Sequence, residues 1–296
     1  MLPVKKIYVD SKGRTVDSKS TTNFAIDMAE SISMPEDTVF VVADILIPHT
    51  WYFLSPNDNR KLYLAIYVND MKDFVPNRTL TSVEIPPGNY DGPALASAID
   101  NALKGPLGSA LGQWIYTVTY DPLSEKITIT PDKFATGKVP DGLGFIRNGF
   151  QLLSTVEINN TADLLAHYGK QETSKMNTVL GNNANPTPLI SNASPYVSLR
   201  VDFMPKKYIF LKSPNLGSFM TLGTFGERTV IKKVPVTAGQ GQLIVDDNRS
   251  AMDVLDCSKQ SFKRLEFQLT DETGEELDLH HHDVSFSLIF SIQPKT

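Results

Sequence analysis

Hydrophobic and polar residues alternate along most of the chain, and this pattern predicts a protein built mainly from β-strands. Residues 24–28 read FAIDM, with large apolar side chains at every second position, which is typical of a half-buried strand. Residues 38–47 read TVFVVADILI and end at Pro48, which indicates a strand buried on both faces. The pattern predicts two more strands before residue 86, at residues 62–68 and 81–85.

The middle of the chain changes to a helical period, which predicts a small α+β unit. Apolar residues between Leu95 and Leu103 recur at helical spacing after Asp91, a residue type that caps helices. Gly105-Pro106 is expected to end this helix. Three more elements are predicted: strands at 114–120 and 126–130 and a helix at 162–168. Residues 171–195 are rich in Asn and Pro and are expected to form a long loop.

A second block of strand patterns follows the loop and continues to the end of the chain. The predicted strands lie at residues 197–203, 207–211, 229–236, 242–245, 262–270, 276–279 and 283–292. Neither block has enough strands to close a sandwich alone, but together they hold roughly eight to ten, which suits a jelly roll. The sequence therefore predicts a mostly-β protein. Residues 1–80 and 196–296 are expected to form a discontinuous jelly-roll β-sandwich, and residues 81–195 an inserted α+β domain.

Charge and cysteine content narrow the function and the cellular setting. A net charge of −5 argues against a general nucleic-acid binder, which usually carries a basic face. Cys257 is the single cysteine, so no intrachain disulfide can form, which favours a reducing compartment. The first residues lack the apolar run of a signal peptide, and no stretch reaches the ~18 apolar residues of a membrane helix. We expect a protein that folds inside a cell.

The first 20 residues are basic, with five Lys or Arg side chains against two Asp. The basic residues are Lys5, Lys6, Lys12, Arg14 and Lys19. One interpretation is a solvated N-terminal arm. The other is an arm that contacts an acidic partner surface or a packaged genome.

Three consecutive histidines, His280, His281 and His282, are the most conspicuous candidate for metal binding. If this segment were a strand, His280 and His282 would share a face with Asp278, and two imidazoles with a carboxylate can bind zinc. Structural zinc sites use four ligands, however, and the sequence supplies no obvious fourth. We expect the three histidines to lie at a polar hairpin end without a metal.

His49 lies beside the aromatic run Trp51-Tyr52-Phe53. A histidine next to aromatic rings can bind a sugar or a nucleobase, but the same residues also pack well at the end of a strand. Packing is the interpretation that we favour.

Residue patterns for catalysis are missing from the sequence. There is no G-x-S-x-G elbow, and Asp256 beside Cys257 would raise the thiol pKa rather than lower it. The Gly/Phe-rich segment 216–226, with Gly217, Gly223 and Gly226, lacks the lysine and following helix of a phosphate-binding loop. We therefore expect no catalytic residue, no cofactor and no enzymatic activity.

Six phrases are spread over most of the chain: Ile7–Thr15 (IYVDSKGRT), Asn23–Met28 (NFAIDM), Val42–Tyr52 (VADILIPHTWY), Ile85–Tyr90 (IPPGNY), Phe267–Gly274 (FQLTDETG) and Val284–Phe290 (VSFSLIF). Together they resemble the minor capsid, or penton, proteins of virophages and Polinton-like DNA viruses. The resemblance implies a jelly-roll structural protein, with no catalytic residues, in an icosahedral virus of the double-jelly-roll lineage. It also implies a homopentamer at the five-fold capsid vertices, in contact with the major capsid protein and assembled inside the host cell.

Two other functions remain open from the residues alone. The chain could be another virion component, such as a cement or receptor-binding protein, which would share nearly every sequence feature. It could also be a carbohydrate-binding or carbohydrate-active β-sandwich that stacks sugars on Trp51, Tyr52, Phe53 and Trp114. The carbohydrate-active version would need two carboxylates in one cleft.

Overall fold

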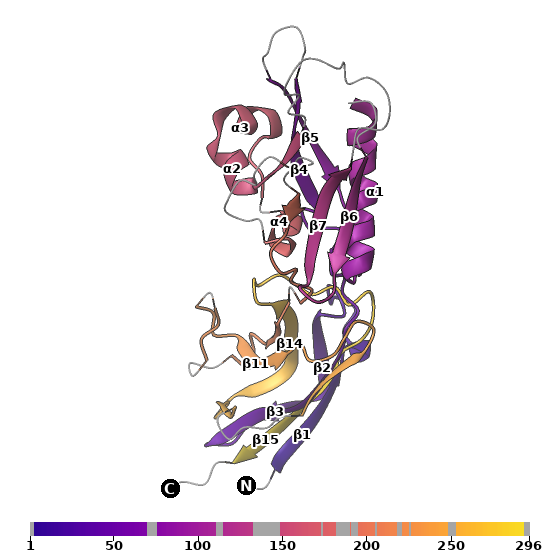
Figure 1. The fold of residues 1–296 in the computed structure, drawn as a ribbon. Helices are drawn as coiled ribbons and strands as arrows, with labels where there is room; N and C mark the ends of the chain where they lie inside the picture. Colours follow the sequence, from indigo (N-terminus) through magenta and orange to yellow (C-terminus); the bar gives the residue numbers. More distant parts are fainter. Residues whose placement is uncertain are drawn as a thin grey trace, which may run out of the picture. The chain divides into compact units, whose positions relative to one another are not determined.

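The chain leaves one folded unit after its third strand and returns to it for the last third of its length. The computed structural model describes residues 3–69, 76–110, 115–132, 149–172, 174–181, 190, 195–204, 206–217, 221–224, 226–247 and 253–292. Unit 1 comprises Met1–Trp51 and Lys206–Thr296, and unit 2 comprises Tyr52–Pro205. Strands dominate the secondary structure (Figure 1).

The described residues of unit 1 form a five-stranded and a four-stranded antiparallel sheet. Its long strands are β1 (Pro3–Asp10), β2 (Asn23–Ser33), β3 (Thr38–Pro48), β10 (Tyr208–Lys212), β11 (Val230–Pro235), β12 (Leu243–Asp246), β14 (Ser261–Asp271) and β15 (Ser285–Ile292). One sheet has the order β1-β15-β3-β12, and the other has the order β11-β10-β14-β2. A short strand, β13 (Leu255–Asp256), also pairs with β3, and a 3₁₀ turn, η1 (Ser11–Gly13), follows β1.

The order of these strands identifies the fold of unit 1. If the eight long strands are numbered along the chain, one sheet reads 1-8-3-6 and the other reads 5-4-7-2. Strands that follow each other in sequence therefore change sheet at every step except the hairpin between β10 and β11. This interleaving of two Greek keys is a jelly roll, which confirms the predicted fold class. Unit 2 is inserted between the third and fourth strands.

The core of unit 1 forms between the inner faces of the two sheets. Phe286 of β15 meets Phe267 of β14 edge-to-face, with ring centroids 4.9 Å apart. Phe290 packs on its neighbour Phe40 within the first sheet, with ring centroids 5.8 Å apart. The inward side chains come from every second residue of these strands, as the alternation in the sequence predicts. Burial of this aromatic layer holds the two sheets together.

Unit 2 contains two three-stranded sheets and four helices. Its strands are β4 (Lys61–Asn69), β5 (Pro76–Glu84), β6 (Ile115–Asp121), β7 (Lys126–Asp132), β8 (Gly149–Leu153) and β9 (Tyr196–Val197). Its helices are α1 (Gly92–Ala110), α2 (Thr155–Asn160), α3 (Ala162–Tyr168) and α4 (Lys175–Val179). The sheet orders are β5-β4-β8 and β6-β7-β9, and α1 lies along β6 (Figure 1).

Strand β4 is the centre of unit 2 because both of its faces are buried. Leu62 and Leu64 face a large core that also contains the apolar stripe of α1. Tyr63 and Ala65 face a smaller cluster formed with α2 and α3. The start of α1 is capped as predicted, since Ala94 N donates to Asp91 Oδ1 at 2.8 Å.

Several expectations from the sequence differ from the structure. The expected boundaries at residues 80/81 and 195/196 lie instead after Trp51 and Pro205, because β4 pairs with β5 and β8 rather than with a strand of the jelly roll. Helix α1 continues past Gly105-Pro106 to Ala110. Proline fixes a φ angle that is itself helical, so it removes one hydrogen bond without ending the helix here. The strand expected at 197–203 is reduced to β9.

Short elements account for most of the omissions. The sequence pattern predicts no element at β8 or α2, and α4 lies within the residues that are expected to form a loop. Strand β1 was expected to be an arm. Residues 182–189 and 191–194 of the expected loop lie outside the described residues.

Replacement of the complete insertion should leave a folded jelly roll. We expect a variant in which residues 52–205 are replaced by a Gly/Ser linker of roughly ten residues to keep β-sheet circular dichroism and a cooperative thermal transition. A matched variant that replaces only residues 86–195 should aggregate, because β4 would lose β8 and α1 and expose Leu62 and Leu64. Equal solubility and equal cooperativity of the two variants would contradict the structural boundary.

Candidate functional site

The three histidines form a tight turn rather than a strand. His280 and His281 both have positive φ angles, 50° and 66°, and His282 N donates to Leu279 O at 3.0 Å. Left-handed backbone is costly for residues other than glycine, although histidine tolerates it better than most. Asp278 stays beside His280, since its Oδ2 lies 3.9 Å from His280 Nε2, but the expected common face with His282 does not form because the chain turns between them.

The imidazole of His280 is occupied by a structural contact. Its Nδ1–H donates to the carbonyl O of Thr50 at 2.7 Å, and Thr50 Oγ1 donates to Leu279 O at 2.8 Å. These two bonds tie the histidine turn to the segment that follows β3. Within the described part of the chain, no three His, Cys, Asp or Glu side chains gather closely enough to hold a metal ion.

His49 is likewise held in place by packing. Its Nδ1–H donates to Ala238 O at 2.8 Å, and its ring lies on Trp51 with centroids 4.1 Å apart. Trp51 is buried in the core of unit 1, whereas Phe53 belongs to the core of unit 2 and contacts Phe203. These two rings therefore do not form one exposed platform for a sugar or base. Trp114 lies outside the described residues.

The single thiol has the environment of a core residue. Cys257 is fully buried, and its Sγ lies 3.5 Å from the carbonyl O of Thr38. Burial, together with the negative charge of Asp256, raises the pKa of the Cys257 thiol to about 12. The sulfur therefore stays protonated and unreactive, which argues against a role as nucleophile.

The basic N-terminal segment is folded into unit 1 and is not an arm. Residues Pro3–Asp10 pair with β15 over the whole of β1, and Thr15 N donates to Ala25 O at 2.9 Å. The side chains of Lys5 and Lys6 remain exposed on this edge strand. Exposed lysines on an edge strand commonly prevent unwanted strand pairing. Lys12, Arg14 and Lys19 are exposed as well.

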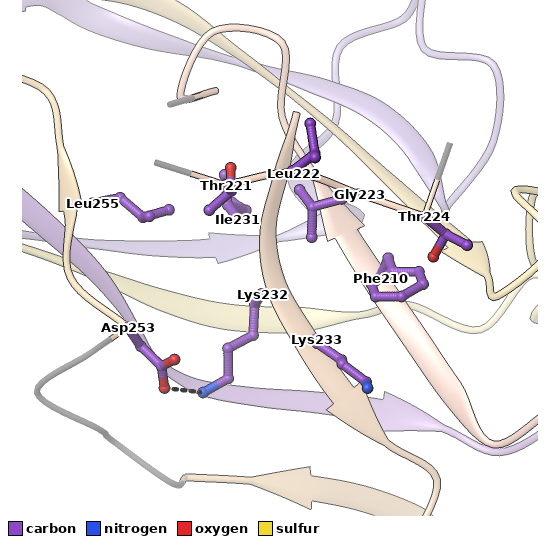
Figure 2. Close-up of a pocket in the computed structure, with 11 residues that line it drawn as sticks. Phe210, Thr221, Leu222, Gly223, Thr224, Ile231, Lys232, Lys233, Asp253 and Leu255 are labelled. Carbon is purple, nitrogen blue, oxygen red and sulfur yellow. Dashed lines mark ion pairs between the residues drawn. The ribbon is translucent and has the colours of Figure 1, made fainter. Parts of the chain in front are cut away.

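An open pocket of about 490 Å³ lies at the edge strand β11 of unit 1 (Figure 2). Its lining residues are Phe210, Thr221, Leu222, Gly223, Thr224, Val230, Ile231, Lys232, Lys233, Asp253 and Leu255. Figure 2 shows the 221–224 segment crossing the upper end of β11, with Asp253 and Leu255 to the left of the strand. The pocket is therefore a hollow between the edge of one sheet and the segment that carries β13.

Residues 221–224 of the Gly/Phe-rich segment form one wall of this pocket, and the described glycines of the segment allow close turns. A Cβ at Gly217 would lie 2.7 Å from the carbonyl O of Arg228, and Gly226 has a φ of +83°. Gly223 N donates to Glu227 O at 2.7 Å and closes the turn. The glycines thus serve the β10–β11 connection, and they do not surround a phosphate-sized site.

Charges at the pocket are already paired. Lys232 Nζ lies 3.6 Å from Asp246 Oδ2 and 3.9 Å from Asp253 Oδ2, as the dashed line to Asp253 in Figure 2 indicates. Lys233 Nζ lies 3.6 Å above the ring of Tyr208. The described lining has one carboxylate and no His, Cys or Ser. It therefore offers neither the carboxylate pair of a glycosidase nor a nucleophile with its base.

We expect tag-free purified protein to contain less than stoichiometric zinc. The reason is that no three His, Cys, Asp or Glu side chains of the described residues gather around His280 or its neighbours. Inductively coupled plasma mass spectrometry of protein purified without added metal measures this directly. One zinc per chain that disappears in His280→Gln/His282→Gln would contradict the prediction.

Cys257 should resist thiol reagents in the native state and react at once after unfolding. Because its folded pKa is about 12 and its ordinary value is 9.0, the unfolded state loses the proton first as the pH rises. The thiol's contribution to the free energy of unfolding is therefore constant below pH 9 and falls between pH 9 and 12. Denaturant titrations at pH 8 and 10 test this, with Cys257→Ala as control. An identical pH dependence of the two proteins would oppose this assignment.

Comparison with solved structures identifies a protein with a similar fold. No model of a known protein family matches the sequence, and no curated protein matches it. In the part of the chain that the structure describes, no helix is long and apolar enough to cross a membrane. Among solved structures, the crystal structure of the mavirus penton protein is similar, with a TM-score of 0.53 and 15% sequence identity. The match covers 97% of this chain and 99% of the mavirus chain, so the two proteins share a fold over nearly their full lengths.

Proposed function

We propose that this chain is a penton protein that forms the homopentameric five-fold vertices of an icosahedral DNA virus of the double-jelly-roll lineage. The observation that carries the proposal is the jelly roll with unit 2 inserted after its third strand, in a chain that matches a mavirus penton protein from end to end. The sequence phrases that resemble virophage pentons give independent support, because that resemblance depends on the amino-acid sequence and not on the fold.

The physical properties of unit 1 suit a vertex subunit. A five-fold ring needs a heterologous interface, in which two different patches of one subunit meet, and these patches must keep a fixed angle. Two sheets packed through a shared aromatic layer can hold such patches rigidly. On this proposal the protein is non-enzymatic, resides in the capsid, contacts the major capsid protein and assembles inside the host cell.

Other functions have less support from the described residues. A cement or receptor-binding protein of the virion would share the fold but would not form five-fold rings. A carbohydrate-binding protein would need exposed aromatic rings, whereas Trp51 and Phe53 are buried in two separate cores. A genome contact through Lys5 and Lys6 is compatible with the proposal but is not required by it.

Electron microscopy of the purified full-length protein tests the proposal. At high protein concentration we expect rings with five-fold rotational symmetry, because the jelly rolls carry the contact. The variant with residues 52–205 replaced should form the same rings if it folds. Three-fold particles would favour a fibre or cement protein instead, and rings formed only by the full-length chain would move the contact to unit 2.

A further inference from the structure

The two edges of one sheet in unit 1 carry opposite charge. Strands β1 and β12 are the outer strands of the sheet β1-β15-β3-β12, and β13 extends the β12 side. The β1 edge exposes Lys5 and Lys6. The opposite edge exposes three carboxylates, which belong to Asp247, Asp253 and Asp256, and Asp253 also lies 3.9 Å from the buried Lys232 Nζ. We call these the basic edge (Lys5 and Lys6 of β1) and the acidic edge (β12 with Asp247, Asp253 and Asp256).

The opposite charges lie at the same level along the strands. Lys5 is opposite Phe290, Phe290 is opposite Phe40, and Phe40 is opposite Leu255. A line across the sheet from Lys5 therefore reaches Leu255, which directly precedes Asp256 and follows Asp253 by two residues. A second line runs from Tyr8 through Ser287 to Asp44, and Asp44 is adjacent to the level of Asp247, since Asp246 is opposite Ile45.

Both edges also expose apolar surface beside their charges. Tyr8 is 74% exposed on the basic edge, and Lys6 Nζ lies 4.6 Å above its ring. On β12, Leu243 is 47% exposed and Val245 is 54% exposed. Asp10 pairs with Ser285, Ser285 with Leu46, and Leu46 with Val245, so Asp10 and Val245 lie at the same level. At this level the carboxylate of one copy would therefore meet an apolar side chain and not another carboxylate. Aromatic and aliphatic contacts of this kind supply most of the energy of an interface, and complementary charges set its register.

The ends of the strands in unit 1 differ from its lateral edges, because the chain enters or leaves the sandwich at the ends. At one end, Pro3 of β1 lies opposite Ser291 of β15, so the first and last strands start and finish together. At the other end, β3 finishes and the chain leaves unit 1 after Trp51. The lateral edges of unit 1 are therefore available for side-by-side contact.

We infer that copies of this chain associate head to tail, with the basic edge of one copy against the acidic edge of the next. This inference rests on the proposed function, and it names the surfaces that form the ring. A closed ring is generated by pure rotation, which leaves the height of every residue along the axis unchanged. When the strands run along that axis, residues at equal levels meet, and Lys5 and Lys6 of one copy face Asp253 and Asp256 of its neighbour.

Charge reversal provides the first test. In Lys5→Glu/Lys6→Glu, and separately in Asp247→Lys/Asp256→Lys, like charges face each other, so the concentration needed for ring formation should rise at least about tenfold. The control Lys207→Glu/Lys263→Glu makes the same net-charge change as Lys5→Glu/Lys6→Glu at other exposed sites of unit 1 and should leave ring formation unchanged. Circular dichroism checks that every variant is folded.

Combining the two reversals separates a specific interface from a general charge effect. The variant that carries all four substitutions, Lys5→Glu/Lys6→Glu/Asp247→Lys/Asp256→Lys, should recover rings of five chains, because opposite charges again face each other at every contact. In a mixture of Lys5→Glu/Lys6→Glu and Asp247→Lys/Asp256→Lys, each chain can bind only a chain of the other variant. The two variants must therefore alternate along any assembly. Because an alternating ring must have an even number of members, the mixture should give chains or even-numbered rings but none of five.

Cysteine cross-linking tests the contact even when association is weak. Tyr8→Cys/Asp247→Cys in one chain should give an oxidised ladder that stops at five chains, since Cys257 is buried. Tyr8→Cys alone and Asp247→Cys alone should stop at two chains.

The outcomes distinguish this inference from the proposed function. Five-fold rings that survive Lys5→Glu/Lys6→Glu at the wild-type concentration, or that form without a cross-linked ladder, would overturn the edge assignment and leave the penton function standing. If the wild-type protein forms no five-fold rings at any concentration and Tyr8→Cys/Asp247→Cys gives no ladder, the edge assignment and the penton function are both wrong.

Discussion

The antiparallel pairing of β3 is the constraint on which unit 1 depends. This strand pairs with β15 on one side and with β12 and β13 on the other, so it joins segments from the beginning and the end of the chain. Its inward residues Phe40, Val42, Ile45 and Ile47 form part of the aromatic and aliphatic core. Outward residues of β3 are also largely apolar, and for this reason the run TVFVVADILI appears continuous rather than alternating. Loss of this one strand would leave β12 and β13 without a partner.

The end of β3 also explains the side chains that first suggested chemistry. Thr50 accepts a hydrogen bond from His280 and donates one to Leu279, while His49 donates to Ala238. Three loops are therefore fastened at the point where the chain leaves the sandwich. Imidazoles suit this task because a single ring offers a directional N–H donor on a flat surface that stacks well, as the contact between His49 and Trp51 shows. Polar residues used for fastening resemble a binding site when only the sequence is visible.

Strands with strong alternation and helices with an apolar stripe could be predicted from the sequence, but the assignment of β4 to a unit could not. The period of residues 62–68 gives the strand, yet both candidate sheets offer an apolar face, and only the pairing with Gln151 and Leu152 of β8 decides. β8 itself is only five residues long, and the Asn148-Gly149 dipeptide at its start marks a turn without deciding which strand β8 pairs with. Likewise, the basic residues of β1 hid the alternation of Ile7 and Val9, which face the core. At the candidate surfaces, charge could be counted in advance, but the equal level of Lys5 and Leu255 depends on register across three strand pairs.

The pairing of β1 with β15 also has a consequence for synthesis of the chain. Pro3 and Ser291 are partners, so the first strand made must wait for nearly the last one before its sheet is complete. Unit 2 is continuous in sequence, and its contacts close while the remaining residues are still being added. Long-range pairing of this kind is slow because the intervening loop must be ordered first. The sheet whose two edges carry opposite charge is therefore among the last parts of the molecule to form, which keeps partly synthesised chains from joining one another.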